Sequence, residues 1–230
     1  MKIGEIIQGI QSLYSKGVES DDTRLMSRHI YNKLLTVRAR LISQDAKKKQ
    51  RISQWNYQTL SCVELIKVPA HDCPCLPPIG CEMLRSKHKL PKPLTGLSGT
   101  LIQTVTTIDR NQKLNEVTMN SVASQKGNKY TSKSNNYFIE NGYLYVTTPN
   151  SKLSVVRVVG LFEDPNEVNM FKSYCEDCID CMDCVDFSKE DFPLDNDMID
   201  AMIELTIKEL IVMFSQIQED NRNDSIDDKS

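Results

Sequence analysis

The sequence predicts an α+β protein in which a helical layer carries an inserted antiparallel β module, either a barrel or a sandwich. Apolar residues recur at helical spacing near both ends of the chain, whereas β-branched and aromatic residues with turn signals dominate the middle. The terminal helices would expose wide apolar stripes, so we expect the N-terminal helix pair and the C-terminal helix to pack together. The expected organisation is a helix pair over 1–54, a β domain over 55–165, an acidic cysteine-rich loop over 166–194, a returning helix over 195–218 and a disordered tail over 219–230.

Two amphipathic helices are expected in the N-terminal region. The first runs from Ile3 to Tyr14, and Gly17 stands where a left-handed cap would end it. The second runs from Ser20 to Gln50, with Ser20 or Asp21 as its cap and Asp22 near the positive end of the helix dipole. Its apolar stripe is expected to comprise Met26, Ile30, Leu34, Val37 and Leu41.

The middle of the chain predicts six strands. We expect strands over 59–68, 101–108 and 115–122, followed by three consecutive antiparallel strands from Tyr137 onward. Asp109 and Asn111 supply a turn, and Asn141-Gly142 predicts a tight hairpin because both residues tolerate positive φ. The Pro- and Gly-rich residues 85–100 and the polar residues 124–136 are expected to form loops.

The C-terminal third is expected to be irregular until a last helix begins. Residues 163–195 are acidic and show no periodic apolar face. From Asp195 to Gln218, apolar residues again recur at steps of three and four, with Asp195, Asn196 or Asp197 as the cap.

Composition indicates a soluble protein that is not exported. Of the 230 residues, 40% are hydrophobic, and no run of about 18 apolar residues is present. The N-terminus lacks the order of charge, apolar block and small-residue cleavage site that marks a signal peptide. The eight cysteines therefore suggest reduced thiols or metal ligands more than a disulfide framework.

Charge is distributed unevenly along the chain although the net charge is only -3. Residues 1–90 contain 15 Lys+Arg against 8 Asp+Glu, whereas residues 161–230 contain 5 against 20. Such a distribution suits contacts between oppositely charged surfaces of neighbouring copies, although solvated charged faces would explain it equally.

Cys175, Cys178, Cys181 and Cys184 repeat at every third position and are candidate metal ligands. A C-x2-C pair is a common half-site for zinc, but zinc sites usually separate their two pairs by a longer connection. The run also differs from the bacterial ferredoxin pattern, which ends C-x3-C-P. A zinc site and a thiol-rich loop without metal therefore both remain open.

A second possible metal-binding set lies in a proline-rich segment and comprises His71, Cys73, Cys75 and Cys81. Its spacing matches no standard zinc knuckle, and the prolines are equally explained as loop-forming residues. Recognised enzyme motifs for hydrolysis, phosphate binding and metalloproteolysis are absent from the sequence, and the three histidines are scattered. No residue is predicted to be catalytic, no cofactor is predicted, and we do not expect an enzyme.

The basic residues Lys47, Lys48, Lys49 and Arg51 are the predicted interaction residues. With Trp55 and Tyr57 just beyond them, they could contact nucleic-acid phosphates and stack on bases. The alternative is a solvated helix end followed by two core or interface aromatics.

Several local motifs together resemble ring proteins of the head-to-tail connector of crAss-like bacteriophages. The motifs are the SDDTR helix start, SQWNYQTLSCVEL, the C-x5-C loop leading to LRS and LPKPL, NGYLYV, GLFEDP and FPLDNDMIDAMIELTIKEL. The resemblance spans most of the chain, but the cysteine run from Cys175 has no counterpart in it.

The resemblance implies a structural virion protein that forms a closed, dodecameric ring below the portal and lines the DNA channel. Its implied partners are further copies of itself, the portal protein, neighbouring ring or tail proteins, and packaged DNA, with no membrane. It also implies a location in the virion after assembly in the host cytoplasm. The alternative function is a nucleic-acid-binding module stabilised by zinc or an iron–sulfur cluster.

Overall fold

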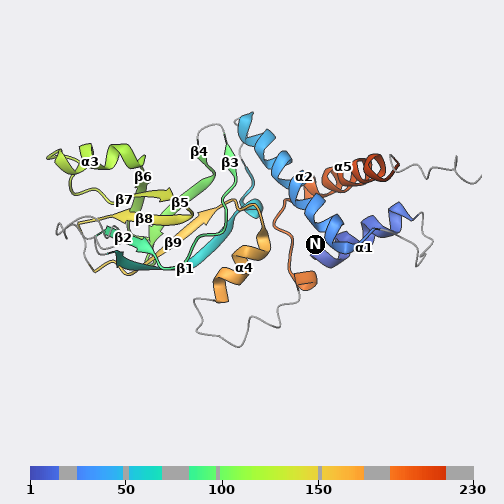
Figure 1. The fold of residues 1–230 in the computed structure, drawn as a ribbon, viewed down its shortest axis with the longest axis horizontal. Helices are drawn as coiled ribbons and strands as arrows, with labels where there is room; N and C mark the ends of the chain where they lie inside the picture. The colour runs from blue at the N-terminus through green and yellow to red at the C-terminus, as the bar shows by residue number, and fades with distance from the viewer. Residues whose placement is uncertain are drawn as a thin grey trace, which may run out of the picture. The chain divides into compact units, whose positions relative to one another are not determined.

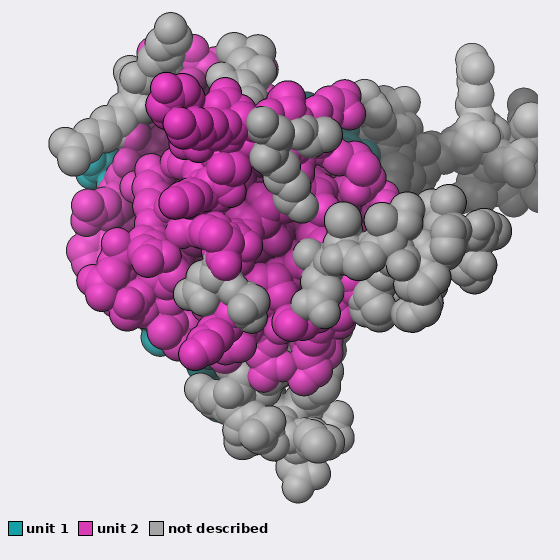
Figure 2. Space-filling view, turned by 90° about the vertical axis from the view of Figure 1, so that its left-hand side faces the viewer, with its two compact units in different colours: residues 1–44, 186–230 teal, residues 45–185 magenta. Residues whose placement is uncertain are grey.

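The computed structural model describes residues 1–15, 25–48, 52–68, 83–96, 99–149, 152–173 and 187–215. The chain divides into two compact units, residues 1–44 with 186–230 and residues 45–185. Figure 2 shows one face of the second unit, in magenta. We call the first the helical unit and the second the barrel unit, and each is described by itself.

The helical unit brings together helices from both ends of the chain (Figure 1). Its helices are α1 (Ile3–Tyr14), most of α2 (Ser27–Lys47), the short η4 (Phe187–Lys189) and α5 (Asn196–Ser215). Ile6, Ile10, Ile30, Leu34 and Met202 are fully buried, so the amphipathic stripes of the three long helices form the core. The prediction of a helical layer built from both termini is confirmed.

Backbone hydrogen bonds join the start of α1 to the segment before α5. The Ile3 amide donates to the Glu190 carbonyl at 2.9 Å, and the Phe192 amide donates to the Met1 carbonyl at 3.0 Å. An isolated bridge pairs Lys2 with Asp191, whose side chains lie 3.2 Å apart. The first of these bonds satisfies the Ile3 amide, a donor of the first turn of α1 that has no partner within the helix.

The expected boundaries of the second helix need correction. α2 begins at Ser27, because Leu25 and Met26 are not helical, so a helix start at Ser20 with caps at Ser20 to Asp22 is wrong. Ser20, Asp21, Asp22 and Gly17 themselves lie outside the described residues, as do Lys49 and Gln50.

The buried stripe of α2 also differs from the expected one. Met26 is 68% exposed and Leu41 is only partly buried, whereas Arg38 and Ile42 are buried together with Ile30, Leu34 and Val37. Ile42 continues the 3.6-residue period through Ile30, Leu34 and Arg38, and Arg38 joins the stripe because its guanidinium finds a partner inside the unit.

The barrel unit contains a closed barrel of seven strands, which confirms the inserted β module. In barrel order the strands are β1 (Gln58–Val68), β2 (Met83–Ser86), β8 (Tyr143–Thr147), β7 (Asn136–Glu140), β6 (Lys113–Glu116), β5 (Ile102–Thr107) and β9 (Val155–Gly160). All neighbouring strands are antiparallel except the parallel pair β6 and β7. A separate two-stranded ribbon is formed by β3 (Thr95–Gly96) and β4 (Gly99–Thr100).

The interior of the barrel is filled by alternating apolar residues of its strands. Leu60, Val105, Leu144, Val156 and Val158 are fully buried in one hydrophobic cluster. The helix α4 (Pro165–Ser173) packs against β1 and adds Val168 and Phe171 to the same cluster (Figure 1). The barrel core therefore includes a helix that follows its last strand.

Two predicted turns of the barrel are confirmed. Asn141 and Gly142 have φ values of 52° and 81°, as a tight hairpin between β7 and β8 requires. In the turn between β5 and β6, the Asp109 carboxylate accepts hydrogen bonds from the Thr107 hydroxyl and from the Asn111 amide and side chain. These hydrogen bonds hold the pKa of Asp109 below its usual value, the Thr107 bond having the largest effect.

Several predictions for the barrel unit were wrong. The expected strand over 115–122 is the end of β6 followed by α3 (Met119–Gly127), which also occupies part of the expected loop over 124–136. The expected loop over 85–100 contains part of β2 and the β3–β4 ribbon. α4 and η4 lie within the acidic stretch 163–195, where no helix was expected.

These helices were not predicted because they are short. α3 and α4 each span nine residues, too few for a periodic stripe, and burial of Val122, Val168 and Phe171 is what holds them. The three strands expected from Tyr137 onward are present, but β9 pairs with β1 and β5 and is not a neighbour of β8.

The last helix is close to its expected start. α5 runs from Asn196 to Ser215, and residues 216–230, including the expected tail, lie outside the described residues. Among the helices that the structure describes, none has the length and apolar character needed to cross a membrane.

Candidate interaction surfaces

Two of the four predicted interaction residues can be located in the structure. Lys47 ends α2 and Lys48 follows it, and both are exposed, whereas Lys49 and Arg51 lie outside the described residues. Trp55, in the short helix η1 (Gln54–Asn56), is 78% exposed, whereas Tyr57 is partly buried and burial raises its pKa. The aromatic nearest to the basic run is therefore available for contact.

The predicted metal ligands cannot be located. Cys175, Cys178, Cys181 and Cys184 lie outside the described residues, and so do His71, Cys73, Cys75 and Cys81. Within the described part of the chain, no group of three or more His, Cys, Asp or Glu residues could hold a metal ion. Cys62, on β1, lies within the described part of the chain, and its side chain is partly buried. Metal binding therefore stays a prediction.

Strand register brings several separate loops together at one end of the barrel. Thr107, the last residue of β5, pairs with Val156, and Asn136, the first residue of β7, pairs with Thr147, the last residue of β8. The connections 108–112 and 128–135, and the described residues 148–149 and 152–154 of the third connection, consequently lie at this end. The end of β1 lies there too, because Val68 pairs with the first residue of β2.

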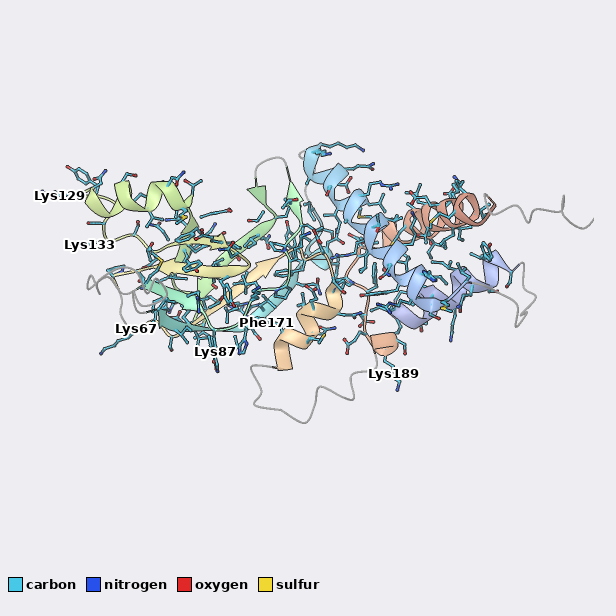
Figure 3. The ribbon with its side chains drawn as sticks, in the orientation of Figure 1. Lys67, Lys87, Lys129, Lys133, Phe171 and Lys189 are labelled. Atoms are coloured by element: carbon cyan, nitrogen blue, oxygen red, sulfur yellow. The ribbon has the colours of Figure 1, made fainter. Side chains whose placement is uncertain are left out.

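Exposed cations gather at this end of the barrel. They are Lys67, Arg110, Lys113, Lys129, Lys133 and Lys152, and we call this set the basic end. Figure 3 shows Lys67, Lys129 and Lys133 on the same side of the barrel unit, at the left of the view. Among the described residues of the three loops, Asp109 is the one carboxylate, and its oxygens are engaged in the turn.

Two hollows lie at this end of the barrel. One, of about 320 Å³, is lined by residues of the β5–β6 turn and the β8–β9 loop, including Gln112, Lys152 and Ser154. The other, also of about 320 Å³, lies beside α3 and is lined mainly by hydroxyl and amide side chains, including Ser132 and Thr148. The basic end therefore combines cations with neutral hydrogen-bonding groups.

The loop between α3 and β7 is held by its own hydrogen bonds. The Tyr130 amide donates to the Asn128 side chain at 2.9 Å, and the Thr131 hydroxyl donates to the Gln125 carbonyl at 2.9 Å. The side chain of Asn136 donates to Gln125 and to Ser134, both at 2.8 Å. These bonds hold the backbone while the Tyr130 side chain stays 88% exposed between Lys129 and Thr131.

The helical unit contains a charge cluster between two of its helices. Glu209 of α5 pairs with Lys33 and Arg40 of α2, with its Oε2 2.5 Å from the Lys33 Nζ. The hydrogen bond from Lys33 and then that from Arg40 hold the pKa of Glu209 below its usual value. This cluster joins α2 to α5 and is therefore structural.

The basic end was missed at the level of sequence because its cations come from four separate segments. Two pairs stand close together in the chain, Arg110 with Lys113 in RNQK and Lys129 with Lys133 in KGNKYTSK, and the sequence predicts a turn and a polar loop for these segments. The sequence feature that could have indicated a nucleic-acid-binding surface is the combination of lysines with a tyrosine in a segment rich in Ser, Thr and Asn.

Comparison with known proteins assigns the chain to a structural family. A search of curated proteins gave no match. The model of the family described as "Phage tail ring protein 2" matches residues 5–229, which is nearly the whole chain and includes both units. The chain therefore belongs to the phage tail ring protein 2 family, among the ring proteins of crAss-like phages.

Proposed function

We propose that copies of this chain form a closed ring in the head-to-tail connector, below the portal, and that the ring lines the channel for packaged DNA. The family match over residues 5–229 carries the proposal, because it assigns a ring protein of the phage tail. Twelve copies would make up the ring, with the portal protein and neighbouring ring or tail proteins as partners. Assembly would take place in the host cytoplasm.

The distribution of charge between the two units supports ring formation. The helical unit contains 11 Lys+Arg against 17 Asp+Glu, whereas the barrel unit contains 17 against 14. In a closed ring each copy offers one surface to the copy before it and a different surface to the copy after it. Surfaces of opposite charge on one chain suit such a heterologous contact.

Mass photometry and electron microscopy of the purified chain test the proposal. We expect closed rings, either of the chain alone or after addition of the portal protein, with a mass close to twelve copies of the 26.2 kDa chain. A chain that remained monomeric at every concentration, with the portal and with each neighbouring ring protein, would contradict it.

A metal-stabilised nucleic-acid-binding module is the second candidate function, favoured by the spacing of Cys175, Cys178, Cys181 and Cys184. Elemental analysis of the purified protein tests it. Zinc or iron near one equivalent would support this candidate, and less than about a tenth of an equivalent, in colourless protein, would eliminate it.

A further inference from the structure

We infer that the basic end of the barrel binds the phosphate backbone of duplex DNA without reading its sequence. The inference deepens the proposed function by naming the surface of the chain that would face DNA. It rests on the proposed function only in assigning this binding to the channel of the virion. The binding of DNA by the purified chain is argued from the structure of the barrel alone.

The first argument is the concentration of positive charge. Lys67, Arg110, Lys113, Lys129, Lys133 and Lys152 are exposed at one end of a single closed barrel. They come from strands and loops that register places at the same end of the barrel, so their positive charge is concentrated there. A nucleic acid that binds several of these cations releases its condensed counterions, which favours binding.

The second argument is the chemistry of the neutral groups beside the cations. Ser132, Ser154 and Gln112 are exposed at the rims of the two hollows. Hydroxyl and amide side chains, together with Lys, Arg and Tyr, supply most of the hydrogen bonds that proteins donate to DNA phosphates. Cations and such donors on several loops suit an extended backbone of repeated phosphates.

The third argument is the order of the loop that carries Tyr130. Four hydrogen bonds of side chains link residues in and beside this loop, two of them to backbone atoms, while the Tyr130 side chain stays in solvent. A tyrosine on an ordered loop can bind with little loss of conformational freedom, because the loop is already in place. The Tyr130 hydroxyl can donate to a phosphate while Lys129 and Lys133 neutralise adjacent charges.

The competing occupant is an acidic segment of another copy of this chain. Residues 216–230 contain five Asp+Glu and two Lys+Arg, so their net negative charge complements the positive charge of the basic end. DNA is favoured because the cations and neutral donors of the basic end extend over several loops, and a short peptide with net charge near -3 would neutralise only part of them.

Salt-dependent binding to DNA tests the inference. The full chain, the K113Q/K129Q/K133Q variant and the matched control K2Q/K189Q/K208Q would be titrated onto a labelled duplex of unrelated sequence by fluorescence anisotropy at several NaCl concentrations. The control removes the same charge from exposed lysines of the helical unit. Circular dichroism would confirm that all three proteins are folded.

We expect the parent chain and the control to bind alike, and the K113Q/K129Q/K133Q variant to bind about tenfold or more weakly at low salt. The slope of log K against log salt should fall in magnitude by about 0.9 for each phosphate that the variant no longer neutralises. Equal affinity and slope for the parent and this variant would overturn the inference, as would an equal weakening in the control. Binding of a labelled 216–230 peptide in place of the duplex would also overturn it.

Mass photometry of the same proteins separates the two proposals. Failure of the parent to form rings with any partner, together with normal DNA binding, would contradict the proposed function alone. Rings that form normally from a parent chain with no affinity for the duplex would contradict this inference alone.

Discussion

At the scale of single residues, the hairpin between β7 and β8 depends on Gly142. Its φ of 81° lies in the left-handed region, and a Cβ there would meet only the Lys89 side chain, at 3.8 Å. The penalty for Gly142→Ala therefore comes from the backbone and should be about 1–2 kcal/mol of unfolding free energy, measured by urea denaturation. Asn141→Gly, at a φ of 52°, is the control and should be close to neutral. An unchanged midpoint for Gly142→Ala would refute this account.

Arg38 is a second residue on which local structure depends. It is fully buried, its Nε donates to the Pro193 carbonyl at 3.1 Å, and its guanidinium carbon lies 5.9 Å from the centroid of the Phe192 ring. Arg38→Met keeps the apolar stem but leaves that carbonyl without this donor, so we expect a loss of about 2 kcal/mol in chemical denaturation. Arg28→Met, at an exposed position of the same helix, should change stability by less than about 0.5 kcal/mol. Equal stability of the two variants would argue against the role of Arg38.

At the scale of elements, Glu209 makes the contact between α2 and α5 depend on pH. Because its pKa is lowered in the folded state, its pairing with Lys33 and Arg40 stabilises the fold fully above the usual carboxyl pKa of about 4.5. That contribution is lost as the pH falls through the lowered pKa. Glu209→Gln should therefore cost about 0.5–1 kcal/mol at pH 7, after allowance for solvent screening, and match the parent in acid.

Chemical denaturation of Glu209→Gln and the parent across pH 2–7 tests the sign of this effect. Glu204→Gln is the control, because Glu204 pairs with Lys208 within one turn of exposed helix and should have a smaller effect. A constant difference between Glu209→Gln and the parent at every pH would contradict linkage to this carboxylate.

The packing of α4 against the barrel is the second prediction at this scale. Phe171 is 5% exposed and belongs to the hydrophobic cluster inside the barrel unit. Phe171→Ala should cost about 3–5 kcal/mol, and hydrogen exchange measured by mass spectrometry should show faster exchange in β1 and β9. Met170→Ala, at a neighbouring position that is 41% exposed, is the control. Similar exchange in both variants would show that α4 is not part of the barrel core.

At the scale of the whole molecule, the basic run at the end of α2 bears on assembly. The sequence predicts that Lys47, Lys48 and Lys49 contact a neighbour's acidic C-terminal region or DNA, and on that prediction charge reversal to Glu at all three should reduce the ring population measured by mass photometry. The reduction should be smaller at high salt because exposed charges are screened. Unchanged assembly of the variant would assign these lysines to a solvated surface.

Features governed by local physics could be predicted. The α1 and α5 stripes, the β1 segment and the Asn141-Gly142 hairpin all follow from residue spacing or from the backbone preferences of one or two residues. By contrast, α3, α4 and β2 are short and carry few buried residues, so their sequences show no period from which to predict them.

By itself, the sequence determined that terminal helices flank a β module and that the chain resembles a phage ring protein, which the family match confirms. Only the tertiary structure decided that the module is a closed barrel with one parallel strand pair, and that β9 lies between β1 and β5. The same closure places Lys67, Lys113 and Lys133 at one end of the barrel. Helix periodicity and turn preferences act over a few residues, whereas strand pairing joins residues far apart in the chain, so the basic end exists only once the barrel has closed.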